Sequence, residues 1–225
     1  GGSAVFSWTW SASGGGDVVF SATASGMTCS DTPVATADGA STSVVGPAVL
    51  AASLTALPAL RNTGQEFLVC LTVTNTGGAD ATGIGCASFA VAGTGGAAPA
   101  DGPYPSLPAA FLPPDAAVTF TWTFTAVSPG LVELSTTVSG TDSLFGGALS
   151  AGPVVSNIVV IQRPAVLSGR AAAFPPQVST GMDFLLTFTV TNSGEAAADG
   201  FAVAGPLSSG TGGVARAGGP FPPVP

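Results

Sequence analysis

The sequence predicts an all-β protein built from tandem β-sandwich repeats. Three observations predict it: many helix-breaking residues, apolar residues that alternate with polar ones, and an internal repeat of about 115 residues. Glycine and proline account for 32 and 19 of the 225 residues, and both destabilise helices. Hydrophobic residues make up 46% of the chain, which is enough for a core and is the reverse of a disordered composition.

The repeat consists of segments that recur at an offset of 114 or 117 residues. Segment 6–12 (FSWTWSA) recurs as 120–126 (FTWTFTA), 114 residues later. Segment 73–77 (VTNTG) recurs as 190–194 (VTNSG), 117 residues later. We expect, in chain order, the C-terminal half of one repeat, a complete repeat and the N-terminal half of another, at residues 1–46, 47–162 and 163–225. Joined end to end, the last and first of these would make one nearly complete repeat.

Each repeat contains segments whose apolar residues lie at every second position, which is typical of strands with one buried face. In 118–126, for example, Phe120, Trp122 and Phe124 alternate with threonines. The proline-rich stretch 103–114 leaves room for at most a short edge strand. Several short strands between turn residues indicate a β-sandwich. The expected strands lie near 48–56, 66–75, 82–92, 116–126, 131–140 and 153–161.

The motifs of the repeat resemble a known group of surface repeats. The pattern consists of Gly64-x-x-Phe67, segment 73–77, the Phe/Trp/Thr strand, Gly130 and segment 138–142 (VSGTD). It resembles bacterial surface repeats of the CARDB type and related conserved-repeat modules. The similarity covers the whole period. It implies immunoglobulin-like sandwiches of seven strands in a secreted, tandemly repeated adhesion or appendage protein. It implies no catalytic residues.

The charge and residue types argue against several functions. The formal net charge is −8, with four basic residues and no histidine. Nucleic acids and anionic membrane surfaces attract clustered cations, so we expect neither as a partner. Acid–base and nucleophilic catalysis commonly use histidine or lysine, so we do not expect an enzyme. The sequence contains no apolar run of 18 residues, so we expect no membrane insertion in this segment.

The cysteines suggest a disulfide. If segments 66–75 and 82–92 form a hairpin about Gly78, Cys70 and Cys86 lie directly opposite each other, and both are absent from the second copy. Opposed residues in a hairpin are close enough for a disulfide, and we expect one, with two free thiols as the alternative. Such a bond would indicate an oxidising compartment. Cys29 would then be free or bonded to another chain.

No cofactor or metal is expected. Three cysteines without histidine or a CxxC spacing do not make a zinc site. Asp80, Glu195 and Asp199 lie in expected turns, where they are typical turn residues, and no Asp-rich calcium loop is present. The threonine- and serine-rich outer faces are candidate positions for O-linked glycans. Tyr104 and Phe221, both among prolines, are the weak candidates for a ligand-binding loop.

The two half-repeats carry the functional hypothesis. Each has an apolar strand face without a partner sheet, and a face with so little charge suits permanent contact with neighbouring copies. We therefore expect an extracellular or cell-surface structural subunit that forms a filament, sheath or appendage, through strands exchanged between copies or through one longer chain. The alternative is an adhesin or stalk module that binds a carbohydrate or a protein. The expected inter-unit core is Phe6, Trp8, Trp10, Val18, Phe20, Phe184, Leu186, Phe188 and Val190.

Overall fold

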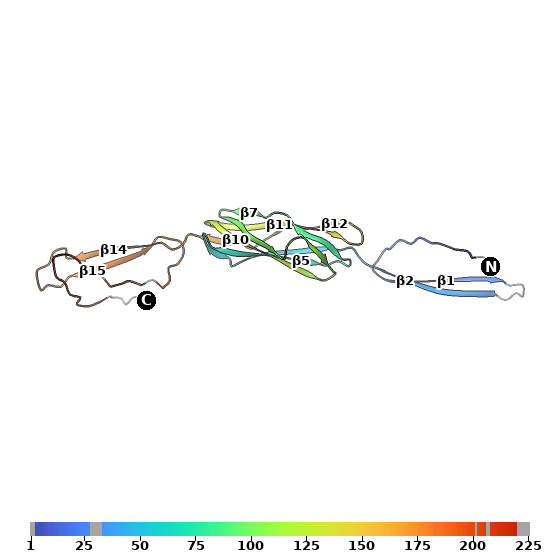
Figure 1. The fold of residues 1–225 in the computed structure, drawn as a ribbon, viewed down its shortest axis with the longest axis horizontal. Helices are drawn as coiled ribbons and strands as arrows, with labels where there is room; N and C mark the ends of the chain where they lie inside the picture. The colour runs from blue at the N-terminus through green and yellow to red at the C-terminus, as the bar shows by residue number, and fades with distance from the viewer. Residues whose placement is uncertain (1–2, 28–32, 201, 206–207, 220–225) are drawn as a thin grey trace.

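The computed structural model of the chain describes residues 3–27, 33–200, 202–205 and 208–219. In this part of the chain it contains strands and no helix, so the all-β prediction is confirmed. A central two-sheet unit lies between two separate two-stranded ribbons, which extend from its opposite ends (Figure 1). The N-terminal ribbon pairs β1 (Gly16–Met27) with β2 (Pro33–Val44), and the C-terminal ribbon pairs β14 (Leu167–Phe174) with β15 (Leu185–Asn192).

The central unit is made of two sheets that share one core. The first has the order β3-β5-β10-β8, and the second has the order β4-β13-β11-β6-β9, with β7 and β12 also paired to β11. The strands of the first sheet are β3 (Leu50–Leu57), β5 (Glu66–Asn75), β8 (Gly96–Tyr104) and β10 (Ala117–Ser128). Those of the second are β4 (Leu60–Asn62), β6 (Ala81–Cys86), β7 (Ala90–Gly93), β9 (Ala109–Leu112), β11 (Gly130–Asp142), β12 (Ala148–Val155) and β13 (Val159–Gln162).

The alternation in the sequence explains the core. In β5 and β10 every second side chain is buried, including Phe67, Leu71, Phe120 and Phe124. The intervening threonines face outward, where β-branched side chains suit a pleated surface. The second sheet contributes buried side chains to the same core: Val132, Leu134 and Val138 of β11 and Ile161 of β13. The arrangement is that of a β-sandwich.

The expected strand 82–92 is present in two pieces. β6 and β7 follow one another along β11: Cys86 of β6 pairs with Val138, and Ala90 of β7 pairs with Ser135. Between them the backbone N–H of Ala87 donates to the carbonyl of Thr137, and the carbonyl of Ala87 accepts a hydrogen bond from the Thr136 hydroxyl. The bond to the Thr136 side chain interrupts the backbone ladder with β11. The expected strand 153–161 likewise covers parts of β12 and β13. The stretch 103–114 contributes the end of β8 and the short β9.

The structure contradicts the expected Cys70–Cys86 disulfide, because both thiols are free. The chain passes from β5 in the first sheet to β6 in the second, so the two segments do not form a hairpin. Cys70 points away from the core, between the buried Val69 and Leu71. Its sulfur lies 3.8 Å from the Thr121 hydroxyl oxygen. Cys86 packs against the core from the other side, and packed sheets are about 10 Å apart, which is too far for a disulfide.

One buried polar side chain, that of Asn75, fixes the start of the central unit. Asn75 is fully buried, and its amide oxygen accepts hydrogen bonds from the backbone N–H groups of Val49 (3.2 Å) and Gly77 (3.0 Å). Its amide nitrogen donates to the carbonyls of Ala79 (2.8 Å) and Leu112 (3.0 Å). The last of these bonds connects the β5 end of the first sheet to β9 of the second, so Asn75 ties the two sheets together.

Candidate interface between repeat halves

The C-terminal ribbon has the same register as a hairpin of the central unit. β14 and β15 pair from Leu167 opposite Asn192 to Phe174 opposite Leu185. Exactly the same pairing links β3 and β5, from Leu50 opposite Asn75 to Leu57 opposite Leu68, at positions 117 residues earlier. The sequence repeat is therefore also a repeat of backbone pairing.

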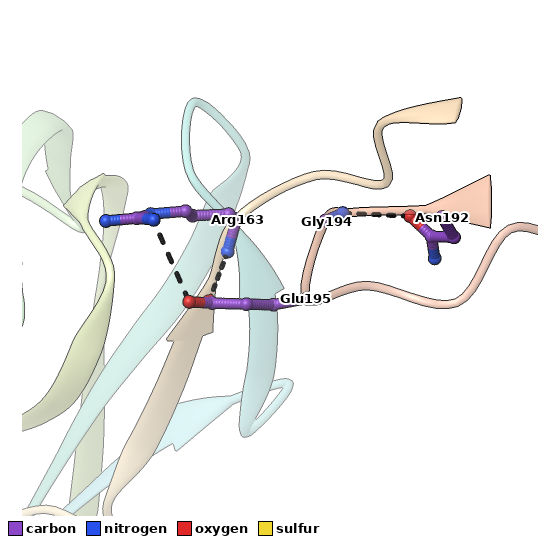
Figure 2. Close-up of polar contacts among 4 residues, drawn as sticks. All are labelled: Arg163, Asn192, Gly194 and Glu195. Atoms are coloured by element: carbon purple, nitrogen blue, oxygen red, sulfur yellow. Dashed lines mark hydrogen bonds and ion pairs between the residues drawn. The ribbon is translucent and has the colours of Figure 1, made fainter. Parts of the chain in front are cut away.

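The turn after β15 repeats the hydrogen bonds of its counterpart. The amide oxygen of Asn192 accepts from the backbone N–H groups of Gly194 (3.0 Å) and Val166 (3.1 Å), and its amide nitrogen donates to the carbonyl of Ala196 (2.8 Å). Figure 2 shows the bond to Gly194 beside the start of the ribbon. These are the contacts of Asn75, apart from the one to Leu112 of the second sheet.

The same turn is attached to the junction with the central unit. One carboxylate oxygen of Glu195 accepts from the Arg163 backbone N–H at 2.8 Å, and the other lies 4.0 Å from the Arg163 guanidinium nitrogen Nε (Figure 2). Both side chains are exposed, so the ion pair itself contributes little. The equivalent positions in the central unit are Gly78 and Gly46, so Glu195 and Arg163 restrain only the second junction.

The C-terminal ribbon differs from its counterpart at its free edge. In the central unit β5 pairs with β3 on one side and with β10 on the other, from Ala117 opposite Thr74 to Thr125 opposite Glu66. Among the described residues, β15 pairs only with β14. Its apolar face is also open, because no second sheet of the described residues covers it: Phe188 is 53% exposed, whereas Leu71 at the equivalent position is 0% exposed.

The N-terminal segment shows the matching deficit. Residues 3–13, which correspond to β10, form no strand, and β1 pairs only with β2 in the described part of the chain. Trp8 and Trp10 are 70% and 72% exposed, although Trp122, at the position equivalent to Trp8, is 7% exposed. Trp122 is therefore a core residue of the central unit, whereas Trp8 and Trp10, which the sequence places in an inter-unit core, are exposed in the single chain.

An apolar hollow lies between the N-terminal segment and the β1–β2 ribbon. The hollow has a volume of about 420 Å³. The ring of Trp10 packs on Phe20 at a centroid distance of 5.3 Å, and Trp8 completes the aromatic wall. The hollow is lined by Trp8, Trp10, Phe20, Ser21, Ala22, Gly39 and Ala40. In the central unit, the equivalents of the three aromatic residues are the core residues Trp122, Phe124 and Leu134.

Two glycines of β1 correspond to glycines of β11 that have close neighbours in the central unit. Gly16 has φ 132°, and its equivalent Gly130 has φ 136°. A Cβ on Gly140 would lie 2.8 Å from the Ile84 side chain and 3.3 Å from that of Leu50, because β6 and β3 pack over it. The same atom on Gly26, the equivalent residue of β1, would meet nothing within 4 Å. Comparing the two copies of the repeat at residue level would have singled out these glycines from the sequence.

The expected inter-unit residues fall into two separate groups in one chain. Phe6, Trp8, Trp10, Val18 and Phe20 lie in the N-terminal part. Leu186, Phe188 and Val190 lie in β15, and Phe184 directly precedes it. None of these nine side chains is buried. The N-terminal and C-terminal parts that contain the two groups are at opposite ends of the central unit (Figure 1), so a single chain does not bring them together.

The other candidate residues give no second site. Tyr104 is exposed, and its hydroxyl donates to the carboxylate of Asp101 at 3.1 Å. Cys29 and Phe221 lie outside the described residues. The residues that the structure describes contain no group of three metal-ligating side chains. They also contain no helix that is long and apolar enough to cross a membrane.

Comparisons with known proteins leave the family open. No family model matches the chain, and no curated protein matches it. The similarity to CARDB-type repeats therefore stays a prediction.

Proposed function

We propose that this chain is a structural unit of an extracellular filament, sheath or surface appendage. In this proposal immunoglobulin-like sandwiches follow one another head to tail, and each half-repeat is completed by the neighbouring unit. The observation that carries the proposal is the C-terminal ribbon. It has the register of β3 and β5, but among the described residues no strand pairs with the edge of β15 that corresponds to the β10 edge of β5.

The energetics support completion by a neighbour. Leaving a large apolar side chain in water forfeits roughly 1.5–3 kcal/mol, and an open strand edge offers unpaired backbone groups to another strand. Both deficits occur at both ends of the chain, and they are complementary. Because the ribbons lie at opposite ends of the central unit (Figure 1), contacts between them generate an open line of units rather than a closed pair.

The surface composition also supports a permanent assembly. Charged residues make up only 7% of the chain, against roughly 25% in a typical soluble domain. Mixed surface charge normally keeps soluble proteins apart. Exposed threonine-rich strand faces with few charges suit contact with other copies or a glycan coat, both of which are consistent with an extracellular location.

Electron microscopy of the purified chain tests this function. We expect long, uniform fibres with an axial repeat of two domains, one central and one composite. Intact mass under denaturing, reducing conditions distinguishes separate subunits, at 21.5 kDa, from a longer parent chain in native material. Phe188→Asp should abolish the fibres, because a carboxylate would enter the composite core, and Thr189→Asp on the other face is the matched control. Dispersed particles from the parent chain would contradict the proposal.

A second candidate function is an adhesin or stalk module. The exposed Trp8 and Trp10 beside an apolar hollow favour it, since aromatic faces can stack on sugar rings. Dispersed particles that retain a glycan, and lose it on Trp8→Ala, would favour this alternative.

A further inference from the structure

We infer that residues 3–11 of one copy form a strand along the open edge of β15 of a second copy, antiparallel to it and with Ser7 opposite Thr187. This inference rests on the proposed function and adds the partner strand, its direction and its register. It assigns the hollow at Trp8 and Trp10 to apolar side chains of the second copy.

The central unit supplies the template for this joint. There β10 runs antiparallel to β5, from Ala117 opposite Thr74 to Thr125 opposite Glu66. The equivalents of β10 lie 114 residues earlier and those of β5 lie 117 residues later, so this register can be transferred to residues 3–11 and β15. Ser3 then lies opposite Thr191 and Ser11 opposite Asp183, so residues 185–191 of β15 are covered.

This register places apolar side chains on one face of the joint. Phe6 lies opposite Phe188, Trp8 opposite Leu186 and Trp10 opposite Phe184. Their equivalents are directly opposed in the central unit: Phe120 with Leu71, Trp122 with Val69 and Phe124 with Phe67. All six of these equivalents belong to the buried core.

Side-chain volumes in each half agree with burial. Where the central unit opposes Leu54 to Leu71, the C-terminal ribbon opposes Ala171 to Phe188. Where β11 has Leu134 and Val138 on its inner face, β1 has Phe20 and Ala24 at the equivalent positions. In both pairs a larger residue is matched by a smaller neighbour, which is the kind of exchange that a packed core tolerates. An exposed face would impose no such matching.

The space above Gly26 also has an occupant in this arrangement. In the central unit the Leu50 side chain lies 3.3 Å from the position of a Cβ on Gly140. The equivalent of Leu50 is Leu167, which is 46% exposed, against 8% for Leu50. In the joint Leu167 of the second copy packs over Gly26.

The surface available is close in size to that of a specific interface. Six aromatic side chains face the joint: Phe6, Trp8, Trp10, Phe20, Phe184 and Phe188. An aromatic side chain buries roughly 150–250 Å² in full, and Phe6, Trp8 and Trp10 still expose 70–74% of theirs. With the exposed parts of the other three and of Leu167 and Leu186, the joint approaches the roughly 1,000 Å² that a specific interface needs. The backbone pairing along β15 adds the hydrogen bonds typical of an added strand.

Paired cysteines test the register. In the central unit the equivalents of Ser7 and Thr187 are Thr121 and Cys70, whose side chains are 3.8 Å apart on the outer face. In the full chain with Cys29→Ser, Cys70→Thr and Cys86→Ala, we expect oxidised Ser7→Cys/Thr187→Cys to give a ladder of linked chains that reductant collapses. The matched control is Thr9→Cys/Thr187→Cys, which is on the same face but two positions out of register. We expect it to link at least ten-fold less, because diagonal positions are too far apart for a disulfide.

The outcomes separate this inference from the proposed function. Fibres of the parent chain with equal linking in both cysteine pairs would overturn the register and leave the function standing. If the disulfide forms but the oxidised protein still migrates as a monomer on a non-reducing gel, the contact lies within one chain. That result would overturn the role of a second copy. Absence of fibres in the parent chain would overturn both. Mixing a chain with Ser7→Cys and a chain with Thr187→Cys should give a linked dimer, and failure of that mixture to link would also overturn the inference.

Discussion

Asn192 makes three of the four hydrogen bonds that Asn75 makes, at a position 117 residues later in the chain. The fourth bond of Asn75 goes to Leu112 in the second sheet. Asn75 is buried by that sheet, whereas Asn192 is exposed. The pair therefore shows one local motif in two settings, with and without the sheet that covers it.

Asn75→Ala is expected to destabilise the central unit by about 2–4 kcal/mol, because it leaves buried backbone groups of both sheets without partners. Asn192→Ala is the matched control and should change the unfolding free energy of the central unit by less than about 0.5 kcal/mol, since its contacts lie within the C-terminal ribbon. Urea denaturation followed by circular dichroism measures both. Equal losses in the two variants would contradict the role given to Leu112.

Asp142 should make the central unit sensitive to acid. Its carboxylate accepts hydrogen bonds from the backbone N–H groups of Phe145 (2.9 Å), Ala48 (2.6 Å) and Leu144 (2.8 Å), which lower its pKa below the ordinary value of 3.8. The stabilisation is fully present above that ordinary pKa and is lost as the pH falls through the lower native pKa.

Asp142→Asn should therefore lower the urea midpoint at pH 7 and reduce its dependence on pH below about 4. Glu133→Gln, on the outer face of β11, is the control and should keep the acid sensitivity of the parent. Urea midpoints between pH 7 and pH 2.5 measure the effect. An unchanged acid response in Asp142→Asn would show that other groups cause it.

Local pattern was enough to predict much of the fold. The alternation of Phe120, Trp122 and Phe124 with threonines has a single structural solution, a half-buried strand, and β10 occupies that place. Which strands pair with each other was harder to predict from the sequence. Cys70 and Cys86 seemed opposed because neighbouring strands often form hairpins, but the chain changes sheets after Asn75. Nothing local signals this, because both strands have one apolar face whichever sheet they join.

The candidate interface was predictable in its residues and not in its geometry. The repeat alone identified the apolar faces that contain Trp8 and Phe188. The contribution of Gly26 depends on what packs over Gly140, and the restraint by Glu195 depends on a turn that also holds Asn192. Such contacts between residues far apart in sequence follow from the sheet arrangement rather than from local pattern.

Cys86 should react slowly in the folded protein. Burial raises the pKa of its thiol above the ordinary 9.0, and the hydrogen bond with Thr136 only partly opposes this effect. At pH 8 the reactive thiolate is therefore scarcer than in an unfolded chain. We expect iodoacetamide to modify Cys86 more slowly in native protein than in urea, as measured by peptide mass spectrometry. Detection of a Cys70–Cys86 disulfide would contradict the arrangement of the two sheets.

Tyr104 should titrate above its ordinary pKa. It is the one tyrosine of the chain, and its hydrogen bond to Asp101, together with the charge of that carboxylate, raises its pKa above 10.0. Ionisation followed by ultraviolet absorbance should shift to lower pH in Asp101→Asn. Asp115→Asn is the control and should leave the titration unchanged. The same midpoint in the parent and in Asp101→Asn would contradict the contact.

Gly26 and Gly140 allow the assembled state to be tested apart from the folded chain. Gly140→Val should destabilise the central unit, because the added side chain would meet Ile84 and Leu50. Overpacking of this kind costs about 1–3 kcal/mol. Gly26→Val meets nothing within 4 Å in the single chain, so the unfolding free energy of the central unit should stay within about 0.5 kcal/mol of the parent. In the composite domain that we propose, however, Leu167 of the next copy would need that space.

We therefore expect Gly26→Val to shorten or abolish the fibres while the central unit stays intact, and Gly140→Val to lower its unfolding midpoint. Analytical ultracentrifugation over a concentration series gives the assembly, and urea denaturation gives the stability. Normal fibres from Gly26→Val would mean that nothing packs over β1 at this position. In that case the open space beside Gly26 would not be a site that a neighbouring copy fills in the way that Leu50 and Ile84 fill the space beside Gly140.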